Sequence, residues 1–226
     1  MSPADGTRAD EIRANLAELE ARIAAACARA GRRREEVQLI AVTKTFPSSD
    51  VEAALAAGIT DVGENRVQEA RDKKPGVVAP ARWHLIGHLQ SNKAKDAVRL
   101  FDVIQTVDSY ALAEKLARAA EGSGMRQEVF IEVNIGREPQ KSGIDPAETD
   151  ALVKQIALLP SLRLAGLMAI PPYVDDVRPF FRELRTIRDT LGLEQLSMGM
   201  SDDFELAIEE GSTMVRVGRA IFGARG

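Results

Sequence analysis

Lys44 directly follows VQLIAVT (residues 37–43), a short apolar segment rich in branched residues. Such a segment is typical of a buried strand, so the lysine amine is expected at the end of that strand, partly removed from water. A desolvated lysine amine gives up its proton more readily and can then attack an aldehyde carbon. The sequence therefore indicates Schiff-base chemistry at Lys44.

Two segments near the end of the chain could hold a phosphate group. Ser201 is expected to cap a helix that begins near Asp203, which would leave its hydroxyl and nearby backbone N–H groups facing outward. Gly218 would let a phosphate oxygen approach the backbone closely. Each residue alone could equally be only a helix cap or a turn residue. Together with Lys44 they favour a phosphorylated carbonyl compound, either a sugar phosphate or pyridoxal phosphate.

Other candidate groups favour structural roles. His84 and His88 are four residues apart, but they flank a strand end and no cysteine or carboxylate cluster accompanies them, so no metal is expected. Cys27 lies on an apolar stripe and is expected to be a packed side chain rather than a reactive thiol. Asp202 and Asp203 suit the beginning of a helix and are expected to be structural.

The elements that must position these residues alternate regularly along the chain. Residues 8–30 predict one amphipathic helix, and the rest of the chain predicts strand–helix units. The expected strands are residues 37–43, 59–64, 82–87, 102–107, 128–135, 162–170, 193–199 and 214–218. The expected helices are residues 48–58, 66–74, 92–100, 109–121, 146–159, 177–191 and 203–210, followed by the short segment RAIFG.

Eight strand–helix units predict an α/β fold, because strands separated by helices must pair in parallel. Eight units within about 190 residues fit a compact (β/α)8 TIM barrel over residues 37–226, with residues 8–30 as an extra N-terminal helix. We therefore expect one domain over residues 1–226. A doubly wound open sheet is the alternative, although no G-x-G-x-x-G follows an early strand.

A barrel places its chemistry at the carboxyl ends of its strands. Polar, sulfur-containing and glycine residues gather at those predicted ends, and this convergence is a stronger signal than any one motif. The candidate cofactor-binding residues are Lys44, Asn65, His84, Met198, Gly199, Ser201, Arg216, Gly218 and Arg219.

Composition limits the partners. The 226 residues carry a formal net charge of −4, which gives no reason to expect nucleic acid or an anionic membrane surface as a partner. No apolar run approaches the length of a membrane span, and the N-terminus has no apolar signal core. A single cysteine cannot form an intrachain disulfide. We expect a cytoplasmic protein.

Several segments together resemble the YggS/PROSC family, the pyridoxal phosphate homeostasis proteins. The resemblance runs from about residue 37 to 225, and its motifs are AVTKTFP, GENRVQEA, WHLIGHLQSNK, VNIGREPQKSG, GLMAI, LSMGMSDDFELAIEEGSTMVRVG and AIFGAR. It implies a barrel of the alanine racemase N-terminal-domain type (PLP fold type III), with pyridoxal 5′-phosphate bound to one lysine.

The same resemblance implies roles for single residues. Lys44 stands at the position of the cofactor lysine, Ser201 and Gly218 match phosphate contacts, Asn65 lines the pocket, and Arg216 lies near the pyridine ring. The sequence departs from the family at Arg66, where an aromatic residue is common, and at His88, a variable place. Both departures concern the pocket rim.

The expected function is cofactor homeostasis: the protein would hold pyridoxal phosphate as a Schiff base on Lys44, buffer it, and deliver it to apo-enzymes, as a monomer or weak homodimer. An arginine at the pyridine nitrogen disfavours ring protonation, and the chain ends soon after the last expected strand, without the β-rich domain of racemases. The alternative is an amino-acid racemase that uses Lys44 with Tyr173 or His84 opposite. A Schiff-base aldolase is a third interpretation.

Overall fold

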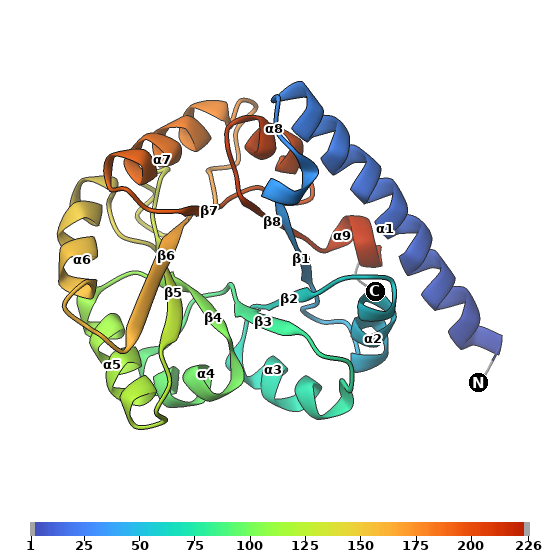
Figure 1. Ribbon diagram of the computed structural model, residues 1–226, viewed down its shortest axis with the longest axis horizontal. Coiled ribbons are helices and arrows are strands. Elements are labelled where there is room, and N and C mark those ends of the chain that lie inside the picture. The colour runs from blue at the N-terminus through green and yellow to red at the C-terminus, as the bar shows by residue number, and fades with distance from the viewer. Residues whose placement is uncertain (1–2, 224–226) are drawn as a thin grey trace.

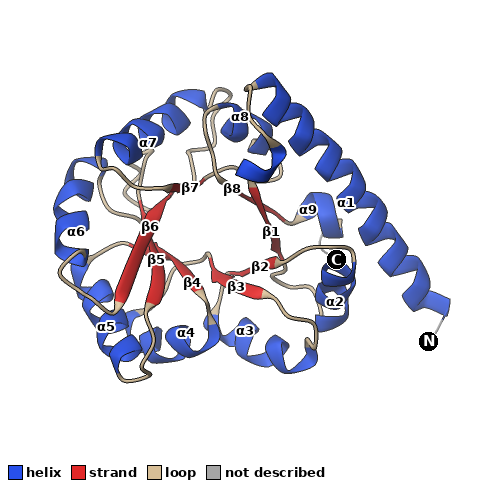
Figure 2. Cartoon of the chain, viewed as in Figure 1, coloured by secondary structure: helices blue, strands red, loops and turns tan. Residues whose placement is uncertain are grey.

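The computed structural model describes residues 3–223. Within that range eight parallel strands pair in sequence order, and the last strand pairs with the first, which closes the sheet into a barrel (Figure 1). Helices form a ring around the strands (Figure 2). The predicted (β/α)8 barrel with an extra N-terminal helix is confirmed, and the open sheet is wrong.

The elements follow the predicted order. The strands are β1 (Gln38–Val42), β2 (Asp61–Glu64), β3 (Arg82–Leu85), β4 (Val103–Val107), β5 (Gln127–Glu132), β6 (Leu162–Met168), β7 (Gln195–Ser197) and β8 (Met214–Val217). The helices are α1 (Pro3–Arg29), α2 (Ser48–Ala56), α3 (Val67–Lys73), α4 (Ala94–Leu100), α5 (Tyr110–Glu121), α6 (Thr149–Ile156), α7 (Arg178–Thr190), α8 (Phe204–Glu209) and α9 (Arg219–Phe222). Single 3₁₀ turns are Arg34–Glu36, Lys74–Gly76, Ser91–Lys93 and Pro146–Glu148.

Several strands end earlier than the apolar pattern predicts. β5 ends at Glu132, although the apolar run continues to Ile135, and β6 ends at Met168 rather than Ile170. Val133 and Ile135 lie outside the strand yet are buried. The apolar run in the sequence therefore continues past the end of the strand, because a buried loop needs apolar side chains just as a buried strand does.

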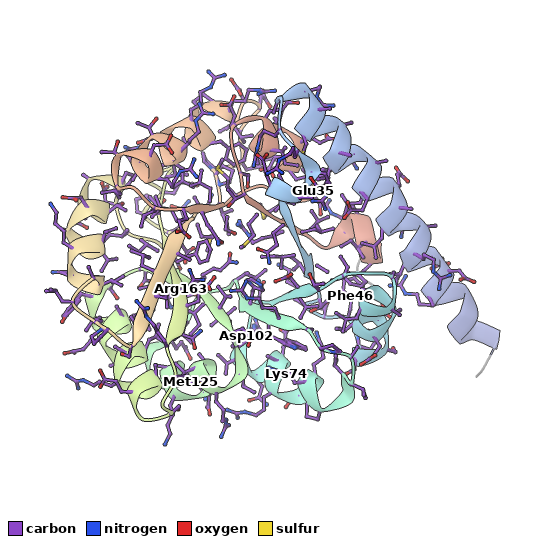
Figure 3. The ribbon with its side chains drawn as sticks, in the orientation of Figure 1. Glu35, Phe46, Lys74, Asp102, Met125 and Arg163 are labelled. Carbon is purple, nitrogen blue, oxygen red and sulfur yellow. The ribbon has the colours of Figure 1, made fainter. Side chains whose placement is uncertain are left out.

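Side chains that alternate along the strands fill two separate layers. Outward-facing residues such as Leu39 and Val215 pack against the surrounding helices. A smaller apolar cluster lies inside the barrel and consists of Ile40, Val103, Phe130, Ala165, Met168 and Met214. Figure 3 shows side chains across the central opening of the ribbon, so the interior is packed rather than a pore.

Helix α1 crosses one side of the barrel and contacts α2, α8 and α9 (Figure 1). It buries the predicted apolar stripe, which is Ile12, Leu16, Leu19, Ile23 and Cys27. Burial raises the pKa of the Cys27 thiol, as expected for a packed side chain. Among the described residues no helix is both long and apolar enough to cross a membrane.

Candidate functional site

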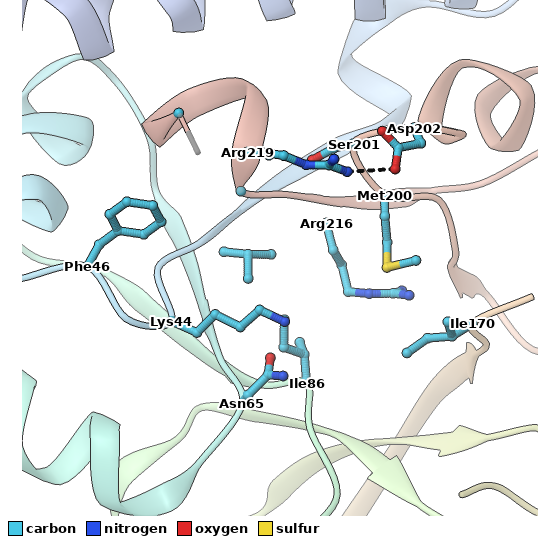
Figure 4. A pocket seen from close by; sticks show the side chains of 13 residues that line it. Lys44, Phe46, Asn65, Ile86, Ile170, Met200, Ser201, Asp202, Arg216 and Arg219 are labelled. Atoms are coloured by element: carbon cyan, nitrogen blue, oxygen red, sulfur yellow. Dashed lines mark hydrogen bonds and ion pairs between the residues drawn. The ribbon is translucent and has the colours of Figure 1, made fainter. Parts of the chain in front are cut away.

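A cavity of about 520 Å³ opens at the carboxyl ends of the strands, where parallel barrels place their chemistry. Loops that follow β1, β2, β3, β6, β7 and β8 form its walls (Figure 4). We call this space the first cavity. Its lining residues are Val42, Lys44, Phe46, Asn65, Ile86, Ile170, Met200, Ser201, Asp202, Arg216, Gly218, Arg219 and Gly223.

Lys44 extends into the first cavity, which Asn65 and Ile86 also line (Figure 4). The next residue, Thr45, has a φ of 70°. This left-handed conformation is unfavourable for a β-branched residue and is typical of strained functional segments. The backbone thus turns sharply just after the lysine, and the Phe46 N–H closes the turn by donating to the Thr43 carbonyl at 3.1 Å.

A buried ion pair supports the backbone beside Lys44 from the outer side of the barrel. The Lys73 ammonium on α3 donates to the Glu64 carboxylate at the end of β2 and to the Thr43 carbonyl at 2.6 Å. The Thr43 hydroxyl donates to the same carboxylate at 2.6 Å. Burial raises the pKa of Glu64 against the opposing effect of Lys73 and Thr43. These contacts connect β1, β2 and α3 at the residue that precedes the lysine.

The loop after β7 brings Ser201 into the first cavity by a route different from the predicted helix cap. The residue before α8 is Asp203, and its carboxylate accepts a hydrogen bond from the Met200 N–H at 2.6 Å. Ser201 therefore does not cap α8, and that prediction is wrong. Its hydroxyl makes no hydrogen bond to any part of the chain that the structure describes, and it remains available to a ligand.

Gly199 makes this loop possible without facing the first cavity. Its φ is +95°, and a Cβ there would lie 2.5 Å from the Ala207 Cβ on α8. Its carbonyl accepts the Arg216 N–H at 3.0 Å. Glycine is therefore required because α8 packs directly on the loop.

Gly218 and Arg219 form the wall at the end of β8. A Cβ on Gly218 would lie 2.9 Å from the Val42 carbonyl oxygen, so only glycine lets the end of β8 approach the end of β1 this closely. Arg219 lies at the mouth of the cavity and pairs with Asp202 at 2.6 Å (Figure 4). The two residues combine an accessible backbone with a positive charge.

A directed chain of hydrogen bonds leads from Arg216 through the barrel interior. The buried Arg216 guanidinium donates to the Ser197 hydroxyl at 2.7 Å, and Ser197 donates to the Gln105 side-chain carbonyl at 2.6 Å. The Gln105 amide contacts His84 Nδ1 at 3.0 Å, and His84 Nε2 contacts the Asp61 carboxylate at 2.8 Å. Asp61 can only accept while it is ionised, which assigns the proton to Nε2 and leaves Nδ1 as the acceptor.

The two charged groups of this hydrogen-bond network, Arg216 and Asp61, have shifted pKa values. Burial lowers the pKa of Arg216 to about 10, although the nearby Asp203 and Glu132 carboxylates oppose the effect. Burial also disfavours ionised Asp61, but hydrogen bonds from His84 and two neighbouring polar side chains outweigh it and hold the pKa of Asp61 below its usual range. At neutral pH this hydrogen-bond network therefore has a cation, Arg216, at the first cavity and an anion, Asp61, deep in the barrel.

A second cavity of about 270 Å³ adjoins the first and shares Asn65, Ile86 and Ile170 as walls. Its other lining residues are Gly87, His88, Glu132, Val133, Asn134, Lys141 and Ser142. Glu132 ends β5 and is 8% exposed, and its Oε2 has no hydrogen-bond partner among the described residues. Burial, reinforced by Asp108, raises the pKa of Glu132 to about 7.

The structure brings six of the nine sequence-predicted residues to the first cavity: Lys44, Asn65, Ser201, Arg216, Gly218 and Arg219. Three others lie outside its lining. His84 and Met198 are fully buried, and Gly199 packs against α8. They support the site through the barrel interior and the loop after β7 rather than as part of its wall.

Sequence reasoning missed the apolar wall and the acidic residue of the second cavity. Phe46, Ile86 and Ile170 follow their strands by one or more residues, and nothing in their type separates them from core residues. Glu132 did carry a signal, since it is a charged residue inside the apolar run EVFIEVNI, near the carboxyl end of a buried strand. Among the residues that the structure describes, no group of histidine, cysteine or acidic side chains is arranged to hold a metal ion.

Comparison with known proteins agrees with the fold. The sequence profile described as alanine racemase, N-terminal domain, matches residues 14–226. The pyridoxal phosphate homeostasis protein of Escherichia coli strain K12 is 44% identical over 231 residues, covering 96% of this chain and 97% of that protein.

Two solved structures resemble the structure of this chain. PipY of Synechococcus elongatus PCC7942, solved with pyridoxal phosphate (PLP) bound, is 39% identical with a TM-score of 0.84, and the match covers 94% of this chain and all of that one. Alanine racemase of Clostridium difficile 630 shares the fold at 16% identity and a TM-score of 0.72. That match covers 96% of this chain but 57% of the racemase chain.

Proposed function

The chain belongs to the family of pyridoxal phosphate homeostasis proteins, and from that premise we propose that it binds pyridoxal 5′-phosphate in the first cavity and takes part in homeostasis of this cofactor. The observation that carries the proposal is the meeting of Lys44 with Ser201, Gly218 and Arg219 in one cavity. The relative solved with PLP bound supports the same ligand.

The residues present fit the cofactor group by group. Pyridoxal phosphate supplies an aldehyde, which a lysine amine can bind covalently with loss of water, together with a pyridine ring and a phosphate. Lys44 offers the amine. The wall that Gly218 forms with Val42 is one that a Cβ would obstruct, and beside it the Ser201 hydroxyl and the Arg219 guanidinium suit a phosphate. The phosphate would compete with Asp202 for Arg219.

The remaining walls suit the ring. Phe46, Ile86 and Ile170 provide apolar surface, and Asn65 provides a polar edge beside the lysine. Arg216 is held by Ser197 and by the Ala169 carbonyl at 3.0 Å, so its guanidinium has a fixed orientation. We place it near the pyridine nitrogen, where a cation disfavours protonation of the ring and so weakens the electron-withdrawing power that amino-acid chemistry needs.

This electrostatic setting favours storage and delivery to apo-enzymes over catalysis. A racemase needs a second acid or base opposite Lys44, and the two residues considered for that role do not reach it. The Tyr173 side chain is fully exposed and lies outside the lining of both cavities, and both ring nitrogens of His84 are engaged inside the barrel. We propose a non-catalytic carrier, one domain over residues 1–226, active in the cytoplasm as a monomer or weak homodimer.

Covalent binding is tested at Lys44. Purified protein loaded with pyridoxal phosphate is reduced with borohydride and mapped by peptide mass spectrometry, and the pyridoxyl adduct is expected on Lys44. Lys44→Ala should abolish this adduct, while the matched control Lys154→Ala, which changes an exposed lysine on α6, should retain it. Protein that takes up no pyridoxal phosphate, or an adduct that persists unchanged in Lys44→Ala, contradicts the proposal.

Turnover of amino acids distinguishes a carrier from an enzyme. The loaded protein is incubated with single L-amino acids in deuterated water and then with an apo-enzyme that requires the cofactor. A carrier shows no sustained exchange at the α-carbon and activates the apo-enzyme. Sustained exchange or inversion of configuration would show that the protein is an enzyme instead.

A further inference from the structure

The second cavity contains a buried carboxylate that the proposed function does not use. Glu132 is 8% exposed, it lines this cavity, and its Oε2 lacks a hydrogen-bond partner among the described residues. Leaving a buried carboxylate oxygen without a donor costs free energy, and unpaired polar atoms of this kind mark places where a ligand completes the bonding. The missing partner is an N–H or O–H donor, and for an ionised carboxylate the strongest donor is a cation.

Other residues that line the second cavity supply donors. The Lys141 ammonium donates to the Pro171 carbonyl at 3.1 Å and pairs with Glu138, which occupies two of its three N–H groups. Ser142, which also lines the cavity, contacts His88 Nδ1 at 3.3 Å. A ligand that meets Glu132 in this cavity can therefore also reach an N–H of Lys141 and the Ser142 hydroxyl, since all three residues line it.

Size and wall chemistry narrow the class of ligand. About 270 Å³ corresponds to roughly nine water molecules at ~30 Å³ each, which is room for a small organic molecule. Ile86, Val133 and Ile170 add apolar surface to the same lining. A carboxylate acceptor, N–H and O–H donors and apolar walls in one small cavity match a small zwitterion with an aliphatic side chain.

We propose that the second cavity binds a small free α-amino acid, with its ammonium group on Glu132 and its carboxylate toward Lys141 and Ser142. The site adjoins the first cavity through Asn65, Ile86 and Ile170. It does not depend on the proposed function, since Glu132, Lys141 and Ser142 are not among the residues assigned to the cofactor.

Saturation-transfer difference NMR on the full-length, cofactor-loaded protein tests the site, with L-alanine as the probe. L-Alanine should bind, propionate, which lacks the ammonium group, should not, and ethylamine, which lacks the carboxylate, should bind more weakly. Glu132→Gln should weaken L-alanine binding at least tenfold. The matched control Glu128→Gln makes the same change on the same strand at the other end of the barrel, where Arg82 and Arg163 pair with it, and should leave binding unchanged.

The outcomes separate this site from the cofactor site. Lys44→Ala should lose the pyridoxyl adduct and still bind L-alanine. L-Alanine binding that disappears in Lys44→Ala but survives in Glu132→Gln belongs to the first cavity and overturns the proposal. Absence of binding overturns it as well, and ethylamine that binds as tightly as L-alanine overturns the assignment to amino acids. Circular dichroism of each variant confirms that it is folded.

Discussion

Glu132 and Arg216 are buried charges of opposite sign that line the two adjoining cavities, and they differ in how completely they are hydrogen-bonded. Arg216 has donors satisfied by Ser197 and Ala169, whereas Glu132 retains an unpaired oxygen. Burial disfavours both charges, and it raises the pKa of Glu132 to about 7. Glu132 therefore changes its charge near neutral pH, while Arg216 stays charged.

The raised pKa of Glu132 predicts a pH-dependent gain in stability for Glu132→Gln. Between the ordinary value of 4.5 and about 7, the folded state binds more protons at this residue than the unfolded state, so its contribution to the free energy of unfolding falls as pH rises. The full penalty above pH 7 is on the order of 3 kcal/mol. Urea denaturation should show Glu132→Gln stabilised relative to the parent protein at pH 8.5, with a difference below about 1 kcal/mol at pH 5.

The matched control is Glu148→Gln, which removes an exposed carboxylate and should change stability little at either pH. Equal destabilisation of Glu132→Gln at both pH values would mean that its charge carries no burial penalty.

At the scale of elements, the approach of β8 to β1 shapes the first cavity. Lys44 follows one of these strands and Gly218 follows the other, and their ends pack together through Val42. The amine and the proposed phosphate contacts at Gly218 and Arg219 therefore depend on one strand pair. An error in that packing would affect covalent attachment and phosphate binding together.

Gly218→Ala tests this packing. The new Cβ would lie 2.9 Å from the Val42 carbonyl and 3.3 Å from the Val42 Cβ, and the strand ends must separate to admit it. We expect a loss of about 1–3 kcal/mol in the free energy of unfolding, measured by urea denaturation, and weaker cofactor uptake, measured by absorbance titration. Gly122→Ala is the control, because its Cβ would meet nothing closer than 3.5 Å; a Gly218 variant that behaves like this control would contradict the close approach.

At the scale of the whole molecule, α1 holds together elements from both ends of the sequence. Its buried face covers α2, α8 and α9, and two of its polar side chains bond to α9. Arg8 donates to the Phe222 carbonyl at 2.8 Å, and Asn15 donates to the Ile221 carbonyl at 3.0 Å. The Phe222 ring in turn packs on Phe46 with centroids 4.8 Å apart, which connects α1 to the wall of the first cavity.

Leu19→Ala should destabilise the whole barrel. Leu19 lies on the buried face of α1 and is 1% exposed, so its truncation leaves a cavity between α1 and the barrel and should cost about 2–5 kcal/mol. Thermal and urea denaturation should show a single, less stable transition. Glu18→Ala, on the exposed face of the same helix, should change stability by less than about 0.5 kcal/mol. A normal barrel transition in Leu19→Ala, preceded by separate loss of helix, would show that α1 is an independent element.

The fold and much of the first cavity could be predicted from the sequence, because both depend on short-range pattern. Apolar runs followed by helices predict the strands, and a strand end predicts where Lys44, Asn65, Arg216 and Gly218 meet. Ser201 lies in the loop after β7, as predicted, but its predicted role as the cap of α8 is wrong because Asp203 is the residue before that helix. His84 is predicted at the cavity wall but lies deeper in the barrel interior, bonded to Asp61 and Gln105, because the apolar pattern does not reveal how far below the cavity a side chain of a strand lies.

Glu132 and the apolar wall could not be predicted for a different reason. Their importance depends on contacts between loops far apart in the sequence, and those contacts exist only after the barrel closes. A charged residue in a buried strand indicates an unusual environment, but only the assembled cavity shows that Glu132 has an unpaired oxygen and which groups face it.

The pairing of β8 with β1 also has a consequence for the order in which a newly made chain becomes functional. During synthesis Lys44 emerges early, whereas the segment that carries Ser201, Gly218 and Arg219 emerges after seven of the barrel strands. Until β8 has left the ribosome, β1 lacks one neighbour and the cavity lacks the wall opposite its lysine. A growing chain therefore exposes its amine without the phosphate contacts, and selective capture of the cofactor begins only when the barrel closes.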